Sequence, residues 1–396
     1  MPGTLRLAPI ALAIALAATA VAVSSVHGER APAAALGTRT EPAATVCLPD
    51  ASPASLARLF VGEPAGIVGA DYQRTIRLPN GDVLWTFQDA EVRRPDGSTT
   101  TVHNIAMVQQ SACFHVLIGG TPSNPLPWLF AADTAQYFRW FWPLGATVGS
   151  DGRVYVFAAE MTERGDSYLT EVVPVGTHVA AFDPDSWTVE WYGRPADGGA
   201  SLYGWSIASD DDWAYLFAQC HRQFGFDEYA LVLAHDRSCA SRVTVARVPV
   251  GRPLDPPRYW DGRRWQADPA RAAPIIEMQG RLANPTQFVF HDNHWLAITK
   301  VGDWWGDRIL IEQSRRATGP FEIIEERRPA AKCIRDCNTY FASWVPAIDA
   351  NSLYAGLSHN RWDGVATAVY RPTFTQVSTP SFAPSPAARC SQGHCD

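Results

Sequence analysis

Two aspartates lie at the far ends of a predicted β-hairpin, and such a pair could carry out acid–base chemistry. The hairpin spans residues 69–90, with the sequence GADYQRTIRLPNGDVLWTFQDA. Its Pro-Asn-Gly segment at 79–81 favours a type I turn followed by a glycine in the left-handed conformation. This three-residue loop places Asp71 directly opposite Asp89. Like charges in that position destabilise a sheet, so the pair calls for an explanation.

The turn type decides whether the two carboxylates share one face of the hairpin. The three-residue loop makes three further pairs: Leu78 with Asp82, Ile76 with Leu84 and Thr75 with Trp85. A two-residue loop would instead pair Asp89 with Tyr72, and the carboxylates would then lie on opposite faces.

A close pair of carboxyl groups fits general acid–base catalysis, and glycoside hydrolysis most directly. One carboxyl group, with its pKa raised by burial or by its neighbour, protonates the departing sugar oxygen. Another carboxylate activates water or attacks the anomeric carbon. The structural alternative is that Asp71 caps a loop and Asp89 binds backbone amides, because hydrogen-bond networks also hold paired acids.

The hairpin's pattern of a polar turn followed by an apolar strand recurs four times. The later copies are SDGRVYVFAAE (150–160), SDDDWAYLFAQ (209–219), HDNHWLAITKV (291–301) and ANSLYAGLSH (350–359). Aligned on the first apolar residue after the turn, the five copies start at Val83, Val154, Trp213, Trp295 and Leu353, which are 58 to 82 residues apart. Units of this size predict an all-β fold, a five-bladed β-propeller. A β-sandwich or two smaller β domains is the alternative.

The repeat also predicts where a binding site would form, because corresponding strand ends meet at one mouth of a propeller. Six positions beyond the aligned residues stand Asp89, Glu160, Gln219, Val301 (beside Lys300) and His359. We expect Glu160 to act as a third carboxylate of the site. Gln219 and His359, together with Asn104, are expected to position sugar hydroxyls.

Tryptophan is abundant, with 15 copies, and several lie near predicted loops. Examples are FRWFWP (138–143), YWDGRRW (259–265) and GDWWGD (302–307). Trp faces stack on sugar surfaces while polar neighbours bind hydroxyls. We expect Trp142, Trp205 and Trp304 to bind substrate, whereas Trp85, Trp213 and Trp295 follow strand periodicity and are expected to pack between blades.

The first part of the chain resembles an export signal. Arg6 precedes an apolar run from 7 to 23 and then small residues, which predicts a cleaved signal peptide over 1–28 and a secreted or cell-wall protein. An uncleaved membrane anchor is the alternative. We further predict an Ala/Pro-rich linker over 29–46, the propeller over 47–372, and a Ser/Pro-rich tail over 373–396 that contains Cys390 and Cys395.

Eight cysteines fit disulfides in an exported protein. Proximity in sequence suggests the pairs Cys220–Cys239, Cys333–Cys337 and Cys390–Cys395, which leaves Cys47 with Cys113, although sequence alone leaves the connectivity open. Zinc binding by Cys333 and Cys337 lacks a second nearby pair. The sequence contains no HExxH motif, EF-hand loop, GxSxG motif or P-loop. His103, His221, His291 and His359 are far apart in the sequence. No metal or cofactor is therefore predicted.

The net charge of −7 argues against nucleic acid and anionic membranes as partners. We expect a monomer whose partner is a polysaccharide.

The run at 69–90, followed by HNIAMVQQ (103–110), resembles the first blade of secreted actinobacterial propellers catalogued as a domain of unknown function. That family is associated with endo-D-arabinanase activity on mycobacterial-type cell-wall arabinan. Later segments similar to this family are FRWFWPLGATVGSDGRVYVFAAEM, YGWSIASDDDWAYLFAQC and TYFASWVPAIDANSLYAGLSHN. The resemblance therefore spans roughly residues 60–372. The resemblance implies a five-bladed fold and hydrolysis of arabinofuranosyl linkages, with Asp71 and Asp89 as catalytic residues and Asn104 at a recurrent polar position.

Two departures from the family pattern fall beside the aspartates. Gly-Ala-Asp-Tyr stands where the family more usually has Gly-Gly-Asp-Gly, and Gln-Asp-Ala where it has Gly-Asp-Thr. Tyr72 and Gln88 are therefore expected to reshape the pocket and contact the substrate. The leading hypothesis is an exported hydrolase acting on arabinan or arabinogalactan. A non-catalytic wall-polysaccharide-binding propeller and a structural scaffold are the alternatives.

Overall fold

The structure is almost entirely β-strand. This computed structural model describes residues 40–130, 139–163, 172–195, 203–219, 242–277, 285–301, 308–328, 337–346, 353–361 and 369–377. Within these ranges, the helical segments are α1 (Pro53–Ala57) and two 3-10 turns, at Arg58–Phe60 and Pro269–Arg271. The prediction of an all-β fold is confirmed.

The predicted hairpin belongs to an antiparallel sheet with the strand order β1-β8-β7-β4-β3. Its strands are β1 (Ala44–Cys47), β3 (Arg74–Arg77), β4 (Val83–Phe87), β7 (Ile105–Gln110) and β8 (Cys113–Leu117). The same part of the chain forms two smaller sheets, β2-β5-β6 and β10-β9. Their strands are β2 (Ile67–Ala70), β5 (Ala90–Arg93), β6 (Thr99–Val102), β9 (Gly119–Thr121) and β10 (Asn124–Leu126).

Further antiparallel sheets follow in chain order. The first contains β11 (Arg139–Val148), β12 (Val154–Glu163), β13 (Val172–Phe182) and β14 (Val189–Gly193). The next contains β15 (Ser206–Ser209), β16 (Trp213–Gln219), β17 (Arg242–Pro249), β18 (Arg258–Trp260) and β19 (Trp265–Gln266), with β20 (Ile276–Glu277) paired to β17. The last two contain β21 (Gln287–His291), β22 (His294–Val301), β23 (Arg308–Ser314) and β24 (Glu322–Arg327), and then β25 (Cys337–Pro346), β26 (Leu353–Arg361) and β27 (Val369–Val377).

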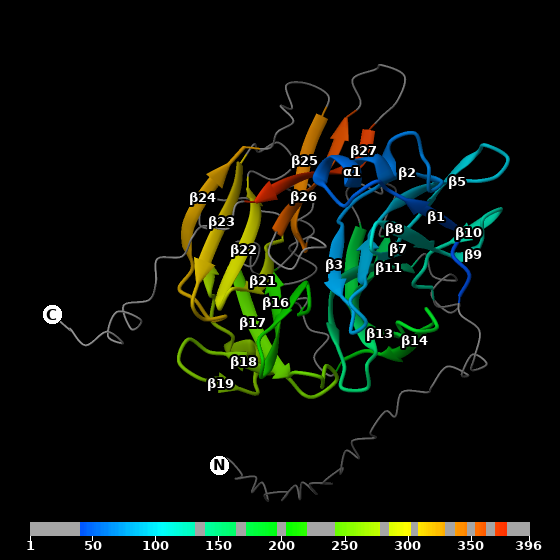
Figure 1. The fold of residues 1–396 in the computed structure, drawn as a ribbon. Helices are drawn as coiled ribbons and strands as arrows, with labels where there is room; N and C mark the ends of the chain where they lie inside the picture. Colours follow the sequence, from blue (N-terminus) through cyan, green and yellow to red (C-terminus); the bar gives the residue numbers. More distant parts are fainter. Residues whose placement is uncertain are drawn as a thin grey trace, which may run out of the picture.

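The strands β3, β11, β15, β21 and β25 are each an edge strand of a different sheet, and they lie at the centre of the molecule. Strand β3 contacts β11 and β25, β15 contacts β11 and β21, and β21 contacts β25, so the contacts return to their starting point. Figure 1 shows the sheets grouped around this common centre. Each of these five sheets therefore has one edge at the centre and extends outward from it.

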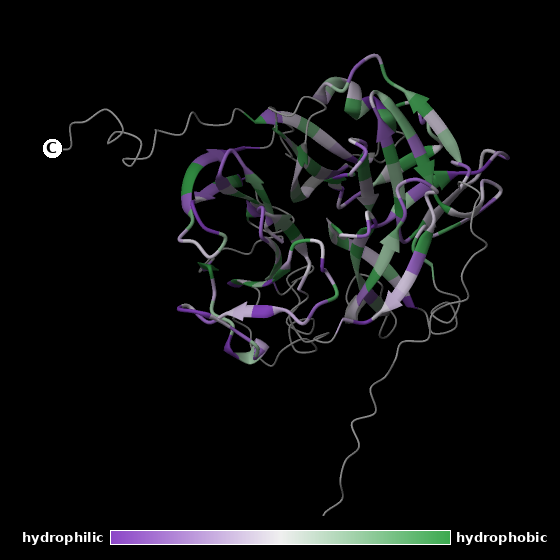
Figure 2. Ribbon diagram, turned by 60° about the horizontal axis from the view of Figure 1, so that its bottom comes forward, coloured by the Kyte–Doolittle hydropathy of each residue, from purple (hydrophilic) through white to green (hydrophobic). Residues whose placement is uncertain are grey.

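Apolar side chains fill the spaces between neighbouring sheets. Each cluster joins side chains of at least two sheets, for example Leu84 with Val156, Phe157 with Leu216, Phe217 with Phe288, Ile298 with Ala342, and Trp85 with Val345. The rings of Phe217 and Phe288 stack with their centroids 3.7 Å apart. Hydrophobic residues are concentrated in the strands, as Figure 2 shows. A single sheet cannot bury both of its faces, so each is stabilised by its neighbours.

The predicted register of the first hairpin is confirmed. Ile76 pairs with Leu84 and Thr75 with Trp85. The N–H of Leu78 donates to the carbonyl of Asp82 at 2.8 Å, and Gly81 has φ +90°. The loop therefore has three residues and its glycine takes the left-handed conformation, as the turn sequence predicts.

Each of the five sequence repeats corresponds to the strand that pairs with the central strand of its sheet. Val83, Val154, Trp213 and Leu353 begin β4, β12, β16 and β26, and Trp295 is the second residue of β22. The strand nearest the centre is the one that precedes each repeat. Side chains at the ends of the repeats are therefore one strand removed from the centre.

The predicted boundaries and disulfides are only partly covered by the described residues. Strand β1 begins at Ala44, within the stretch predicted as a linker, and β27 runs to Val377, past the predicted boundary at 372. The Cys47–Cys113 disulfide is present and joins β1 to β8. The signal segment 1–28 and the remaining predicted disulfides lie outside the residues, or the side chains, that the structure describes. No helix in the described chain is long and apolar enough to span a membrane.

Replacing Gly145 with alanine tests how tightly the central strands pack. A Cβ at Gly145 would lie 2.6 Å from the Ile207 nitrogen and 2.9 Å from the Gly204 oxygen, both backbone atoms of the next sheet. Gly145→Ala should therefore lower the free energy of unfolding by about 2–3 kcal/mol, measured by urea denaturation. The control Gly97→Ala, at φ +85° with no neighbour within 4 Å, should cost about 1 kcal/mol. Equal losses in the two variants would contradict the close approach.

Candidate functional site

Asp71 and Asp89 face each other beyond the end of the hairpin. The N–H of Asp71 donates to the carbonyl of Asp89 at 3.2 Å, and the carbonyl of Asp71 accepts from the N–H of Gln88 at 3.1 Å. The next pair along the two strands is Ala70 with Ala90, so the hairpin register continues through the aspartates. The predicted placement of the two residues is therefore confirmed.

The Asp71 side chain is buried, with the residue 7% exposed. Its Oδ2 accepts a hydrogen bond from the Tyr340 hydroxyl at 2.7 Å, while Oδ1 has no hydrogen-bond partner among the described residues. Burial raises the pKa of Asp71 well above its ordinary value, and the charge of Asp89 raises it further. The Tyr340 and Tyr370 hydroxyls and the charge of Arg74 oppose this shift without cancelling it. Asp71 therefore retains its proton to a higher pH than an ordinary aspartate.

Asp89 has the opposite surroundings, because its carboxylate is held by hydrogen-bond donors. The indole N–H of Trp142 donates to Oδ1 at 3.0 Å, and Nδ1 of His103 lies 3.0 Å from the same oxygen. The Asp89 side chain is 17% exposed, so solvent reaches it. The His103 ring stacks on Trp140 with centroids 4.4 Å apart. These contacts hold the Asp89 carboxyl group in a fixed orientation.

Tyr72 lies next to Asp71 in an unusual backbone conformation. Its backbone has φ +48°, a left-handed conformation that is uncommon for a residue with a side chain. Its N–H donates to the Ser358 hydroxyl at 3.0 Å, and its ring packs on Phe341 with centroids 4.6 Å apart. The ring is buried between the first and last sheets, so Tyr72 forms part of the wall beside Asp71.

Glu160 does not join the aspartate pair but is held by three basic side chains. Arg139 Nη1 donates to one carboxylate oxygen at 2.7 Å, His178 Nε2 lies 2.9 Å from the other, and Arg194 also donates to it. Burial by itself would raise the pKa of Glu160, but the hydrogen bonds from His178, Arg139 and Arg194 outweigh it and lower the pKa to about 2. An ionised and fully engaged carboxylate is poorly suited to proton donation.

Two of the predicted sugar-positioning amides form hydrogen bonds between neighbouring sheets instead. Asn104, fully buried, donates to the carbonyl of Phe141 at 2.7 Å and accepts from the N–H of Leu129 at 2.6 Å. Gln219 accepts from the N–H of Thr286 at 3.0 Å. These bonds tie the first sheet to the second and the third to the fourth.

The remaining predicted binding residues are buried where the structure describes them. Gln88 is buried and donates to the carbonyl of Pro143 at 3.4 Å. Trp205 is 2% exposed and His359 is 8% exposed, on β26. Trp142 contributes its indole N–H to Asp89 rather than an open ring face. Trp304 lies outside the described residues.

Three residues at the site are not predicted as site residues from the sequence. His103 contacts Asp89, and its position just before Asn104 in the quoted first-blade motif is the signal that could have identified it. Tyr340 approaches Asp71 from β25, far along the chain, and no local pattern indicates this. Arg74, two residues beyond Tyr72, is 5% exposed.

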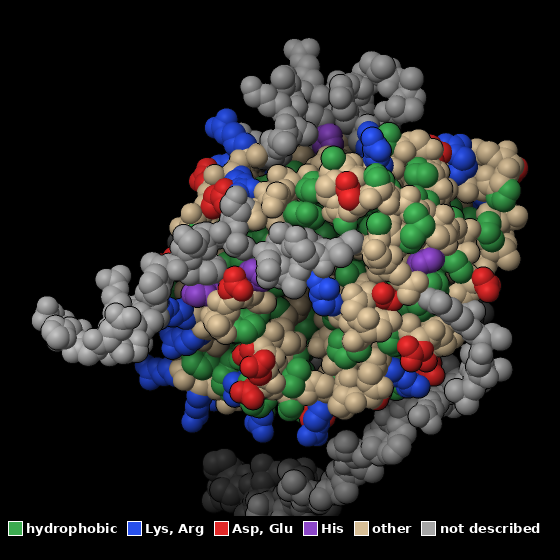
Figure 3. Space-filling model, in the orientation of Figure 1, with side chains coloured by type: hydrophobic (Ala, Val, Ile, Leu, Met, Phe, Trp, Pro, Cys, Tyr) green, Lys and Arg blue, Asp and Glu red, His purple; other side chains and the backbone are tan. Residues whose placement is uncertain are grey.

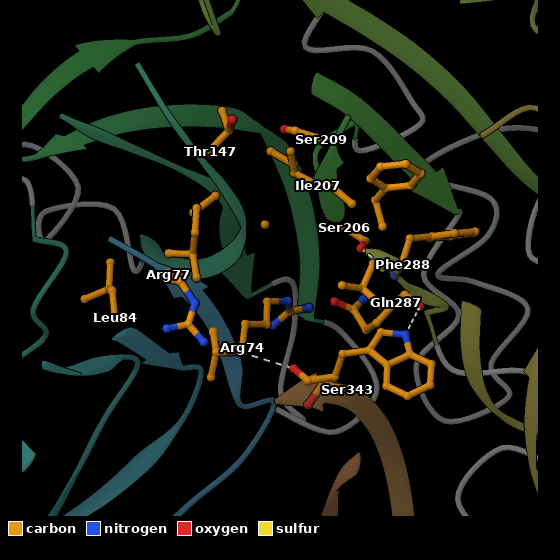
Figure 4. Close-up of a pocket in the computed structure, with 18 of the residues that line it drawn as sticks. Arg74, Arg77, Leu84, Thr147, Ser206, Ile207, Ser209, Gln287, Phe288 and Ser343 are labelled. Atoms are coloured by element: carbon orange, nitrogen blue, oxygen red, sulfur yellow. Dashed lines mark hydrogen bonds between the residues drawn. The ribbon is translucent and has the colours of Figure 1, made fainter. Parts of the chain in front are cut away.

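A cavity of about 470 Å³ lies between the central strands and is drawn in Figure 4. Its lining includes Arg74 from β3, Ser206 from β15, Gln287 from β21 and Ser343 from β25. Neither Asp71 nor Asp89 lines this cavity. The aspartates therefore lie beyond the Arg74 end of the central space.

The described residues contain no group of three metal-ligating side chains that could hold an ion. Over the face drawn in Figure 3, acidic and basic side chains are mixed across much of the surface, and basic side chains gather along its lower left edge.

A model of the family described as Domain of unknown function (DUF5005) matches residues 58–379. The chain belongs to this family. Its description names no activity, so membership covers the β-rich part of the chain without assigning chemistry. No curated protein matches the sequence.

Several solved structures resemble this member of the family. A "putative hydrolase" from Bacteroides ovatus ATCC 8483 has 16% identity and a TM-score of 0.59, with 78% of this chain and 86% of that chain covered. The GH43_1 enzyme from Xanthomonas citri has 15% identity and a TM-score of 0.47, covering 79% and 88%. A xylan beta-1,4-xylosidase from Bacillus halodurans C-125 has 9% identity and a TM-score of 0.45, covering 81% and 60%. At 16% identity, the likeness to the Bacteroides ovatus protein concerns the fold alone.

The ion cluster around Glu160 predicts a distinct acid sensitivity. Because the folded pKa of about 2 is below the ordinary value of 4.5, the ionised form stabilises the fold fully above that value, and this contribution is lost as the pH falls toward 2. Glu160→Gln should cost about 2 kcal/mol at neutral pH, an amount limited by the exposure of Arg139 and Arg194. Urea denaturation of both proteins across this pH range measures it. A loss that is the same at the two ends of the range would contradict the assignment.

Proposed function

We propose that this chain is an exported glycoside hydrolase that cleaves a furanoside polysaccharide, with cell-wall D-arabinan as its substrate. The observation that carries the proposal is the contrast between the two facing aspartates. Burial and the neighbouring charge raise the pKa of Asp71, while the Trp142 indole N–H and the His103 ring hold the carboxyl group of Asp89 in place. A buried carboxyl group that keeps its proton beside a second, more exposed carboxyl group is what acid–base cleavage of a glycoside requires.

In the proposed reaction Asp71 is the general acid. Its Oδ1, which has no hydrogen-bond partner among the described residues, carries the proton and gives it to the glycosidic oxygen as the bond to the anomeric carbon breaks. The Tyr340 hydroxyl stabilises the carboxylate that remains. Asp89 takes a proton from the attacking water, or attacks the anomeric carbon itself, and the products leave with the elements of water added.

The proposed architecture is a five-bladed propeller. Support comes from the closed circuit of contacts among β3, β11, β15, β21 and β25, and from the five apolar clusters that each join at least two sheets. The substrate and the secreted location rest on the first-blade resemblance and on the signal-like residues 1–28, and we infer that the protein acts as a monomer.

A cleavage assay tests the function. Purified mature protein incubated with arabinogalactan should release oligosaccharides, detected by mass spectrometry. Asp71→Asn and Asp89→Asn should each reduce the rate by about 10²–10⁴-fold, the usual contribution of a catalytic acid or base. Asp96→Asn, which removes a surface carboxylate from the same region of the chain, should leave the rate unchanged. Equal product release from the wild type and all three variants would contradict the hydrolase proposal.

A non-catalytic polysaccharide-binding protein is the second candidate. The observation in its favour is that neither aspartate lines the 470 Å³ cavity and that Asp71 is only 7% exposed. Binding of arabinogalactan without released products, unchanged in both aspartate variants, would establish this alternative.

A further inference from the structure

The central cavity has a positively charged lining. The cavity extends from buried Arg74 to Arg77, at the exposed end of β3, and to Val250, which follows β17 and is 43% exposed. His291 also lines it, and none of the described lining residues is acidic. A chain with a net charge of −7 has thus placed basic groups, without acidic ones, along its central space. Such a lining favours an anionic occupant.

The inner end of the cavity contains a guanidinium with an unused edge. Arg74 Nη1 donates to the carbonyl of Tyr72 at 3.0 Å, whereas Nε and Nη2 have no hydrogen-bond partner among the described residues. Nε and Nη2 form one edge of the planar group, with two parallel N–H donors. Buried donors are nearly always paired, so this edge calls for an acceptor.

Aromatic rings hold this guanidinium in place. Its central carbon lies 4.7 Å from the Phe341 ring centroid and 5.4 Å from that of Trp205. Burial lowers the pKa of Arg74 to about 9, and Tyr72 and Asp71 limit the shift, so the group is charged at neutral pH. The rings interact with its charge but do not accept its in-plane N–H groups.

Hydroxyl groups complete the inner end of the cavity. The Ser206 oxygen accepts from the N–H of Phe288 at 2.9 Å, and the Ser343 oxygen accepts from Gln73 Nε2 at 3.2 Å. Each hydroxyl therefore has its own O–H left to donate. Figure 4 shows Arg74, Ser206 and Ser343 around the same space.

We propose that the inner end of this cavity binds a carboxylate through the Nε and Nη2 edge of Arg74. A carboxylate has two oxygens at the spacing that this edge matches, which gives a bidentate pair. The volume of about 470 Å³ suits a ligand of monosaccharide size rather than a single small ion. The carboxylate can belong to a free organic acid or to a uronic acid. This site does not depend on the proposed hydrolysis.

Calorimetric titration of the mature protein tests the proposal, with acetate and glucuronate as the acids and glucose as the neutral probe. Wild-type protein in chloride-free buffer near neutral pH should bind at least one acid and bind glucose at least about tenfold more weakly. Tighter binding of glucuronate than of acetate assigns the site to a sugar acid, and the reverse order assigns it to a small free acid. Failure of both acids to bind at up to about 20 mM would overturn the proposal.

Variants locate the binding. Arg74→Met should weaken it by at least about tenfold, whereas the matched control Arg77→Met, at the exposed end of the same cavity, should change it by less than about threefold. Unchanged binding in Arg74→Met would also overturn the proposal. If that variant fails to fold by circular dichroism, Ala146→Phe decides, because it fills the cavity and leaves Arg74 in place. Full binding in Ala146→Phe would contradict the site.

Discussion

Two carboxyl groups that face each other across a hairpin set the demands that the surrounding structure meets. Asp71 and Asp89 occupy directly opposed positions, and two ionised carboxylates there would repel each other in a poorly solvated space. The structure reduces this conflict by surrounding the two groups differently. Asp71 is buried, whereas Asp89 is more exposed and receives hydrogen bonds from Trp142 and His103. Burial therefore keeps a proton on Asp71 at a pH at which an ordinary aspartate has lost it.

Other sheets contribute the groups that produce this difference. Tyr340, which donates to Asp71, comes from β25, and Trp142, which donates to Asp89, comes from β11. These strands lie on either side of β3 in the central circuit of contacts. Packing of neighbouring sheets therefore also places the hydrogen-bond donors of the aspartates. A change that separates the sheets should disturb the pair even when it lies far from either carboxyl group.

The hairpin could be predicted from sequence because its determinants are local. Pro79, Asn80 and Gly81 specify the loop, and strand periodicity then fixes the register out to Asp71 and Asp89. The five repeats were recognisable for the same reason, since each is a turn followed by one apolar strand. Sequence could not show that the repeats mark the second strands of the sheets, because spacing along the chain does not report distance from the centre.

The functions of individual polar residues were harder to predict, since they depend on contacts between sheets. Glu160 has the type and position expected of a catalytic carboxylate, yet Arg139, His178 and Arg194 converge on it. Asn104 and Gln219 were expected to bind sugar, yet each bonds to the backbone of a neighbouring segment. The unused edge of Arg74 is visible only when the side chains around it are in place.

The central claim is that buried Asp71 holds its proton well above the pH at which an ordinary aspartate loses it. Carbon-13 NMR of protein labelled at the aspartate carboxyl groups, titrated from acid to neutral pH, tests it most directly. The account predicts one aspartate signal that stays in the protonated position well above the ordinary pKa of about 3.9 and is missing from Asp71→Asn. Titration of every aspartate at or below that ordinary value would contradict the account.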